Sequence, residues 1–211
     1  MDRSFGRFDI QLLTRSRKPP IRKLNKQQNN LLTNDHSKLD ELLDQVFAAL
    51  RNGDHVKALA NLDYFWARLA MHIRAEHLHL FPILLQKAAE PYSLEGVGDI
   101  LSRLPDTISF LRRDHDFFVN ELGRCVNCLR EQHSEKREAE MVDLGEIQSN
   151  LLEVAQRLEV HNELEEKEVY PLAQVLFNSE EIAALIVLVK RELANVPPRF
   201  RSHLSEDDNT K

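Results

Sequence analysis

An internal repeat limits this chain of 211 residues to few folds. The segment LTNDHSKLDELL (32–43) aligns with LRRDHDFFVNEL (111–122), and HIRAEHLHLFPIL (72–84) aligns with HNELEEKEVYPLA (161–173). The chain therefore carries a histidine, an HxxxE motif, a second histidine and a second HxxxE motif, in that order. If each copy forms a helical hairpin, the two hairpins can bury their apolar faces against each other. The repeat predicts an all-α, up-down four-helix bundle with approximate two-fold symmetry.

Helix-starting and helix-ending signals indicate where the elements lie. We expect helices over residues 29–52, 55–90, 105–133 and 138–177, and a fifth helix over 179–193. Asn52-Gly53 is typical of a helix end, Pro105 suits a first helical position, and Pro82 is expected to bend or interrupt the second helix. The predicted organisation is a basic flexible tail (1–28), the bundle (29–178), an additional helix (179–196) and a second flexible tail (197–211).

The histidines of the repeat lie on apolar helix faces. A helix advances by about 100° per residue, and with this step the apolar residues of each helix fall on the same side as its histidine. In both HxxxE motifs the glutamate follows one turn after the histidine and shares its face. Six side chains are therefore expected to point into the core: His36, His72, Glu76, His115, His161 and Glu165.

Carboxylates buried at the centre of a bundle need a positive partner. An unpaired buried carboxylate costs several kcal/mol, and two together also repel each other. Metal ions remove this cost, because imidazole and carboxylate both donate to them. In the alternative interpretation the histidines are ordinary core residues and Arg68 and Arg157 pair with the glutamates. That interpretation requires the same pattern to occur by accident on four inward faces, so the pattern favours a metal site.

Composition argues against several other classes of protein. The net charge of −6, with charges of both signs, does not suggest a nucleic-acid binder, and no apolar stretch of about 18 residues could cross a membrane. The two cysteines, Cys125 and Cys128, exclude a disulfide framework, and they lie inside a predicted helix rather than in a redox motif. The start of the chain has no secretory signal. We expect a cytoplasmic protein.

The order H…HxxxE…H…HxxxE, with LFP and YPL closing the second and fourth helices, resembles the hemerythrin-like family of HHE cation-binding domains. The resemblance covers about residues 29–177. It implies a four-helix bundle around a non-haem di-iron centre, with two Fe ions bridged by oxo or hydroxo; Mn or Zn is not excluded. By position, four histidines would be terminal ligands and two glutamates would bridge the ions: His36, His72, His115, His161, Glu76 and Glu165.

The chain departs from the oxygen-carrying members of that family at one ligand position. Animal hemerythrins have a second histidine one turn after the third-helix histidine, where this chain has Val119. His79 is the first candidate for a replacement ligand, because its helical angle returns to within about 20° of His72. Glu168 takes the equivalent place on the fourth helix. His77, displaced by about 140°, is the third alternative.

The resemblance implies a protein that binds or senses a small ligand. Two ions with these donors retain an open position, which suits O₂, NO or peroxide. The alternatives are a di-iron enzyme or iron-handling protein, acting in peroxide decomposition or iron-centre repair, and an iron-responsive regulatory module. Whether the protein is an enzyme stays open at this point. A protein partner or a homodimer could use the fifth helix; no nucleic acid and no membrane is expected.

Overall fold

The computed structural model describes residues 30–90, 98–132 and 144–203. The predicted basic tail over 1–28 and the end of the predicted second tail, 204–211, lie outside these residues. Every regular element described is helical: α1 Asn30–Arg51, α2 His55–Ala75, η2 Glu76–Leu80, α3 Phe81–Ala88, α4 Gly98–Gln132, α5 Leu144–Leu164, η3 Glu165–Val169, α6 Tyr170–Leu176, α7 Ser179–Leu193 and η4 Pro198–His203. Among them, no helix has both the length and the apolarity needed to cross a membrane.

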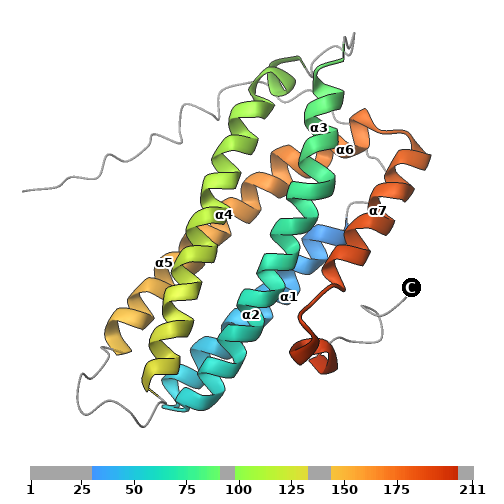
Figure 1. The fold of residues 1–211 in the computed structure, drawn as a ribbon. Helices are drawn as coiled ribbons and strands as arrows, with labels where there is room; N and C mark the ends of the chain where they lie inside the picture. The colour runs from blue at the N-terminus through green and yellow to red at the C-terminus, as the bar shows by residue number, and fades with distance from the viewer. Residues whose placement is uncertain (1–29, 91–97, 133–143, 204–211) are drawn as a thin grey trace, which may run out of the picture.

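The predicted all-α four-helix bundle with an additional C-terminal helix is confirmed. Its members are α1, the continuous run α2–η2–α3, α4, and the continuous run α5–η3–α6, and Figure 1 shows consecutive members running in opposite directions. α1 packs against α2 and α5, and α4 packs against the same two helices. The additional helix α7 lies outside the bundle, against α2 and η2.

Two clusters of buried apolar side chains fill the bundle. The first, which we call the turn-side cluster, lies towards the α1–α2 turn and includes Leu50, Leu62 and Leu129. The second, which we call the α7-side cluster, includes Phe81 and Leu111 together with Leu185, Val189 and Leu193 of α7. Burial of such side chains is the main favourable contribution to folding.

The α1–α2 turn follows the predicted stop signal. α1 ends at Arg51, and Gly53 adopts a left-handed conformation with φ of 69°. Side chains other than glycine rarely adopt this conformation, which explains the glycine at this position. Asp54 then caps α2, since its side chain accepts a hydrogen bond of 3.0 Å from the backbone N–H of Lys57.

A π-helical segment interrupts the second and the fourth bundle members at the same place. In η2 the N–H of Phe81 donates to the carbonyl of Glu76, and in η3 the N–H of Tyr170 donates to that of Glu165, five residues back in both cases. A proline stands two residues after the end of each segment, as Pro82 and Pro171, and cannot donate a backbone hydrogen bond. The interruption expected at Pro82 is therefore a wide turn that begins at Glu76.

Two boundaries differ from the sequence-based expectation. α4 begins at Gly98 rather than at Pro105, because Ile100, Leu101 and Leu104 bury apolar side chains in the α7-side cluster and tertiary packing overrides the proline signal. Residues 198–203, expected to belong to a flexible tail, form the 3₁₀ helix η4 instead. Phe200 accounts for this difference, since it packs on Tyr64 of α2 with ring centroids 5.3 Å apart.

Candidate metal centre

The core-facing residues of the repeat meet between the two apolar clusters. On α1 and α4 the histidine lies between residues of the turn-side cluster and residues of the α7-side cluster, and on α2 and α5 the change from one cluster to the other falls within a few residues of it. The two glutamates are the first residues of the two π segments. All six residues are at most 2 % exposed: His36 of α1, His72 of α2, Glu76 of η2, His115 of α4, His161 of α5 and Glu165 of η3.

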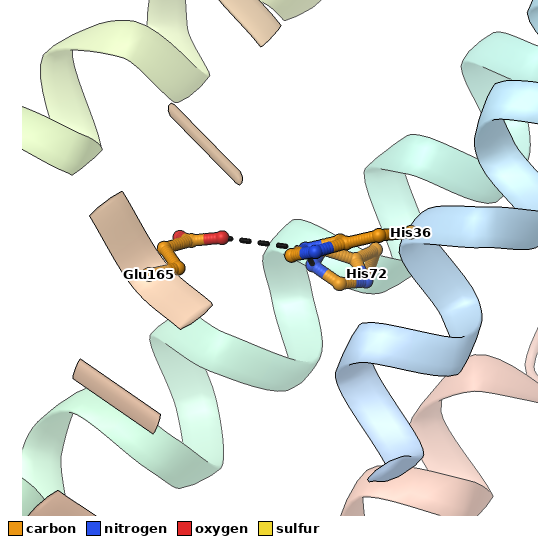
Figure 2. Close-up of side chains that lie close together, drawn as sticks. All are labelled: His36, His72 and Glu165. Carbon is orange, nitrogen blue, oxygen red and sulfur yellow. Dashed lines mark hydrogen bonds and ion pairs between the residues drawn. The ribbon is translucent and has the colours of Figure 1, made fainter. Parts of the chain in front are cut away.

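The first half-site is built by His36 and His72. Their Nε2 atoms lie 3.1 Å apart, and Glu165 Oε2 lies 3.4 Å from His36 Nε2. Figure 2 shows the two imidazoles side by side, with the Glu165 carboxylate of η3 pointing at them. Glu76 Oε1 completes the group at 3.6 Å from His72 Nε2.

The second half-site repeats this arrangement with His115 and His161. Glu165 Oε1 lies 3.0 Å from His161 Nε2 and 3.7 Å from His115 Nε2, and Glu76 Oε2 lies 3.3 Å from His115 Nε2. Each carboxylate therefore places one oxygen in each half-site. Glu165 joins both groups of three potential ligand atoms that lie within 4.8 Å of one another, one with His36 and His72 and one with His115 and His161.

All four histidines share one orientation, with Nε2 turned inward and Nδ1 turned outward. The outward Nδ1 atoms of His36 and His72 lie 2.8 Å from Glu166 Oε1 and 3.0 Å from Asp35 Oδ2. A metal-binding histidine commonly uses its second nitrogen in this way, because the outer acceptor fixes the tautomer and the ring orientation.

The third and fourth histidines also have an outer partner. His161 Nδ1 lies 3.4 Å from Asp114 Oδ2, and His115 Nδ1 lies 2.9 Å from His77 Nε2. Arg68 pairs with Asp35 and Arg157 pairs with Asp114; neither arginine pairs with a core glutamate in the described residues. The interpretation in which arginines neutralise Glu76 and Glu165 is therefore wrong.

The donor set fits a pair of cations. Among the residues that the structure describes, buried Glu76 Oε2 and Glu165 Oε1 find no hydrogen-bond partner, and both belong to the second half-site. A buried polar atom without a partner is costly and needs an explanation. A metal ion in this half-site would supply the missing partner to both oxygens.

Charge interactions shift the pKa values of the central groups. Burial acts to lower the pKa of His72, but Glu76 and Asp35 raise it to about 10; in the same way Glu165 and Asp114 outweigh burial and raise the pKa of His161 to about 9. Burial acts to raise the pKa of Glu76, yet the neighbouring imidazoles hold it well below its usual range. In the metal-free protein, the protonated histidines therefore compensate the buried carboxylates.

Tyr170 is a central residue that the sequence analysis missed. Its hydroxyl donates to Glu76 Oε1 at 2.7 Å and to Glu165 Oε2 at 3.1 Å, and it lies 3.2 Å from His36 Nε2. All these atoms belong to the first half-site. A regular helix would turn Tyr170 away from the face of His161, nine residues earlier, whereas the wide turn of η3 brings it inward. The aligned pairs Phe81-Pro82 and Tyr170-Pro171 carry the available signal, since only the second copy has the hydroxyl.

The structure does not bring His79 to this centre. Its Nε2 lies 3.9 Å from Glu192 Oε2 of α7, while the neighbouring His77 reaches His115. The expectation for His79 used a step of about 100° through η2, and a π turn advances by less per residue. Glu168 is half-buried and belongs to neither group of potential ligands.

A groove of about 720 Å³ between α1 and α5 leads to the first half-site. His36 lines its wall together with acidic side chains such as Asp40, Asp44 and Glu166, and apolar side chains such as Leu43 line other parts of it. Burial and the neighbouring acids raise the pKa of Asp40. The groove gives the imidazole of His36 a polar approach from solvent.

The cysteines take no part in this site. Cys125 is buried in the turn-side cluster, and burial raises the pKa of its thiol to about 11. Both cysteines are free thiols. A thiol with a raised pKa is a poor nucleophile and a poor metal ligand at neutral pH.

The chain matches a known protein family. The family described as Hemerythrin, Hemerythrin HHE cation binding domain, matches residues 28–173, which is more than half of the chain. No curated protein and no solved structure matches the chain. The matched range contains all six core-facing residues and Tyr170.

Proposed function

Since the chain belongs to the hemerythrin family of HHE cation-binding domains, we propose that it holds two iron ions and binds a small ligand such as O₂, NO or peroxide. One observation carries the proposal: each of two buried carboxylates directs one oxygen towards each pair of imidazoles. Glu76 and Glu165 would bridge the ions. His36 and His72 would be the terminal ligands of one ion, and His115 and His161 those of the other.

The number of donors supports binding of a small ligand. Four imidazoles and two shared carboxylates leave each ion with about four protein donors, fewer than the six that octahedral coordination requires. Iron with open positions binds small oxygen- and nitrogen-containing molecules. The groove beside His36 supplies an approach for an ion or for such a ligand.

The residues of the chain have separate roles in this proposal. Bound iron would supply the electrons for the interaction with the small ligand. The Nδ1 contacts hold the imidazoles with Nε2 inward, and the two apolar clusters exclude water above and below the centre. The Tyr170 hydroxyl holds a proton between Glu76 and Glu165. We also propose a cytosolic location, in which Cys125 and Cys128 stay reduced.

Metal analysis combined with an ultraviolet-visible spectrum tests the proposal. We expect about two irons per chain in protein purified from its own host, with absorption typical of an oxo-bridged ferric pair. Glu76→Gln and Glu165→Gln should each abolish paired occupancy, since both remove a carboxylate shared between the half-sites. Glu168→Gln, on the same segment as Glu165 but outside the candidate ligand groups, is the matched control and should load normally. Normal paired loading of either core variant would contradict the bridging assignment.

The response to O₂ separates binding from catalysis. A spectrum that changes reversibly with O₂ or NO, without consumption of peroxide, would support binding or sensing. Turnover of peroxide by the purified iron-loaded protein would support the enzyme alternative instead.

A further inference from the structure

The two half-sites have the same inner donors but different outer supports. In the first, Asp35 contacts both His72 and the guanidinium of Arg68, which is 2 % exposed. In the second, Asp114 contacts His161 and Arg157, whose side chain is 40 % exposed. The two half-sites therefore match in their imidazoles and carboxylates and differ in the arginines that contact the aspartates.

Arg68 joins the first half-site to the additional helix α7. Its Nη2 donates to Asp35 Oδ1 at 2.5 Å, and its Nη1 donates to the backbone carbonyl of Leu193 at 2.9 Å. Asp35 Oδ2 in turn accepts from His72 Nδ1 at 3.0 Å. A continuous chain of hydrogen bonds thus runs from the end of α7 to an imidazole that faces the centre.

The contact with Leu193 lies where a helix most needs a donor. Leu193 is the last residue of α7, and carbonyls in the last turn of a helix have no partner within that helix. A cation at this end also interacts favourably with the helix dipole. The same last turn holds Glu192, which accepts from Arg74 Nε at 2.6 Å. α7 is therefore fastened to α2 at its C-terminal end, next to the centre.

The second half-site has a different arrangement around its arginine. Arg157 donates to Asp114 Oδ1 through Nε at 2.8 Å and through Nη2 at 2.5 Å. Its guanidinium carbon lies 4.2 Å from the centre of the Phe117 ring, on the neighbouring bundle helix α4. Arg157 thus uses its donors on one aspartate, whereas Arg68 divides its donors between the aspartate and α7.

We infer that Arg68 is a positioning residue that couples docking of α7 to the orientation of His72, and so to metal retention in the first half-site. The inference rests on the proposed di-iron function. Coupling between two equilibria is reciprocal. Undocking of α7 should therefore weaken retention of one ion, and loading of that ion should make α7 harder to undock.

Release of iron to a chelator measures the first half of this coupling. The full-length protein is loaded anaerobically with ferrous iron, and release is followed with a colorimetric ferrous chelator. Arg68→Lys keeps the positive charge and most of the aliphatic side chain. It loses the planar guanidinium, which donates to Asp35 and to the Leu193 carbonyl at the same time. We expect one of the two iron equivalents to leave about tenfold faster than in wild type, the loss typical of a disrupted outer partner. The other equivalent should leave at the wild-type rate.

Hydrogen exchange of the α7 amides measures the second half. In wild type, loading with iron should slow exchange in α7, and Arg68→Lys should abolish that difference. Arg157→Lys is the matched control, because it alters the equivalent arginine of the second half-site and should leave the response of α7 intact.

A variant remote from the centre separates coupling from a purely structural effect. Val189 is 2 % exposed in the α7-side cluster, so Val189→Asp should undock α7 while leaving the Arg68–Asp35 pair in place. It should speed release of the same single equivalent. Undocked α7 with both equivalents released at wild-type rates would overturn the inference, as would equal acceleration of both equivalents by Arg68→Lys. A wild-type protein that takes up no pair of ions would overturn the proposed function, and this inference with it.

Discussion

At the scale of single residues, the centre is defined by the direction of its imidazoles. All four present Nε2 to the carboxylates and Nδ1 to an outer partner, although the outer partners differ: Asp35, Asp114, Glu166 and His77. An outer acceptor holds each ring before an ion arrives, which lowers the entropy that binding must remove. The inner imidazoles and carboxylates match in the two copies, and the variation lies in the outer partners and in Tyr170, whose aligned residue in the first copy is Phe81.

Metal binding should release protons from His72 and His161. Their pKa values in the metal-free protein are raised to about 10 and about 9, so both are protonated at pH 7.5. A histidine must be neutral to bind a metal. Apparent affinity should therefore rise with pH until about pH 9–10 and level off above it. Calorimetry of iron binding at pH 7.5, in buffers of different ionisation enthalpy, measures the protons released; a buffer-independent heat would contradict the prediction.

Tyr170→Phe should destabilise the metal-free protein more than the iron-loaded protein. Without iron, the hydroxyl donates to two buried carboxylates, and loss of a donor to a buried acceptor costs about 1–3 kcal/mol. Bound ions would compensate the same oxygens. Urea unfolding of both forms measures the difference. Tyr64→Phe is the control, since Tyr64 lies against Phe200 and away from the centre. An equal loss in both forms of Tyr170→Phe would show that the hydroxyl has another role.

The centre was only partly predictable from the sequence, and the reason is local geometry. The repeated histidines and the first glutamate of each π segment precede the wide turn, so a step of about 100° per residue describes them correctly. His77, His79 and Tyr170 lie within or just after that turn. For His79 and Tyr170 the regular step gives the wrong face, and the pattern alone does not reveal a π segment.

At the scale of helices, the π segments position the carboxylates. Glu76 and Glu165 begin η2 and η3, and a proline stands directly after the first residue that follows each segment. The wide turn changes the direction of every later side chain and directs Tyr170 to the centre and His79 to α7. π turns are rare and are frequently found at functional sites. Their presence in both copies agrees with such a role.

The turn between α1 and α2 provides a prediction for element ends. Gly53 has φ of 69°, so Gly53→Ala should destabilise the protein by about 1 kcal/mol. Gly98→Ala is the matched control: the added methyl group would meet nothing within 4 Å at the start of α4, and alanine favours helix. That variant should be as stable as wild type or slightly more stable. Thermal or urea unfolding compares the two. Equal stability of the Gly53 variant would contradict the assigned conformation.

Helix ends were predictable where local chemistry determines them. Asn52-Gly53 marks the end of α1 within one residue. The start of α4 was not predictable, because burial of Leu104 in the α7-side cluster extends the helix past the signal of Pro105. The formation of η4 was not predictable for the same reason, because it depends on a contact between Phe200 and Tyr64, which are far apart in the chain.

At the scale of the whole molecule, the centre lies between two separate apolar clusters and draws on every member of the bundle. A ligand that binds only the folded state stabilises it in proportion to its occupancy. Removing the ions should therefore lower the stability of the entire bundle and not of one region alone.

Chelation of iron should lower the melting temperature. Free metal at about 100 times its dissociation constant contributes about 2.7 kcal/mol, which corresponds to roughly 5–10 °C for a protein of this size. Calorimetric scans before and after chelation measure the shift. Glu165→Gln serves as the control, because a variant that cannot hold the pair should melt at nearly the same temperature with and without iron. An unchanged wild-type transition would show that the ions do not stabilise the bundle.

The division of each carboxylate between the two half-sites has a consequence for how such a protein can change over generations. Glu76 belongs to the first copy of the repeat and Glu165 to the second, yet each directs one oxygen into each half-site. Neither copy alone supplies all the donors of either half-site. If one copy lost its donors, the other copy could not form a complete half-site by itself. A substitution that damages either copy would therefore impair both half-sites and be subject to selection.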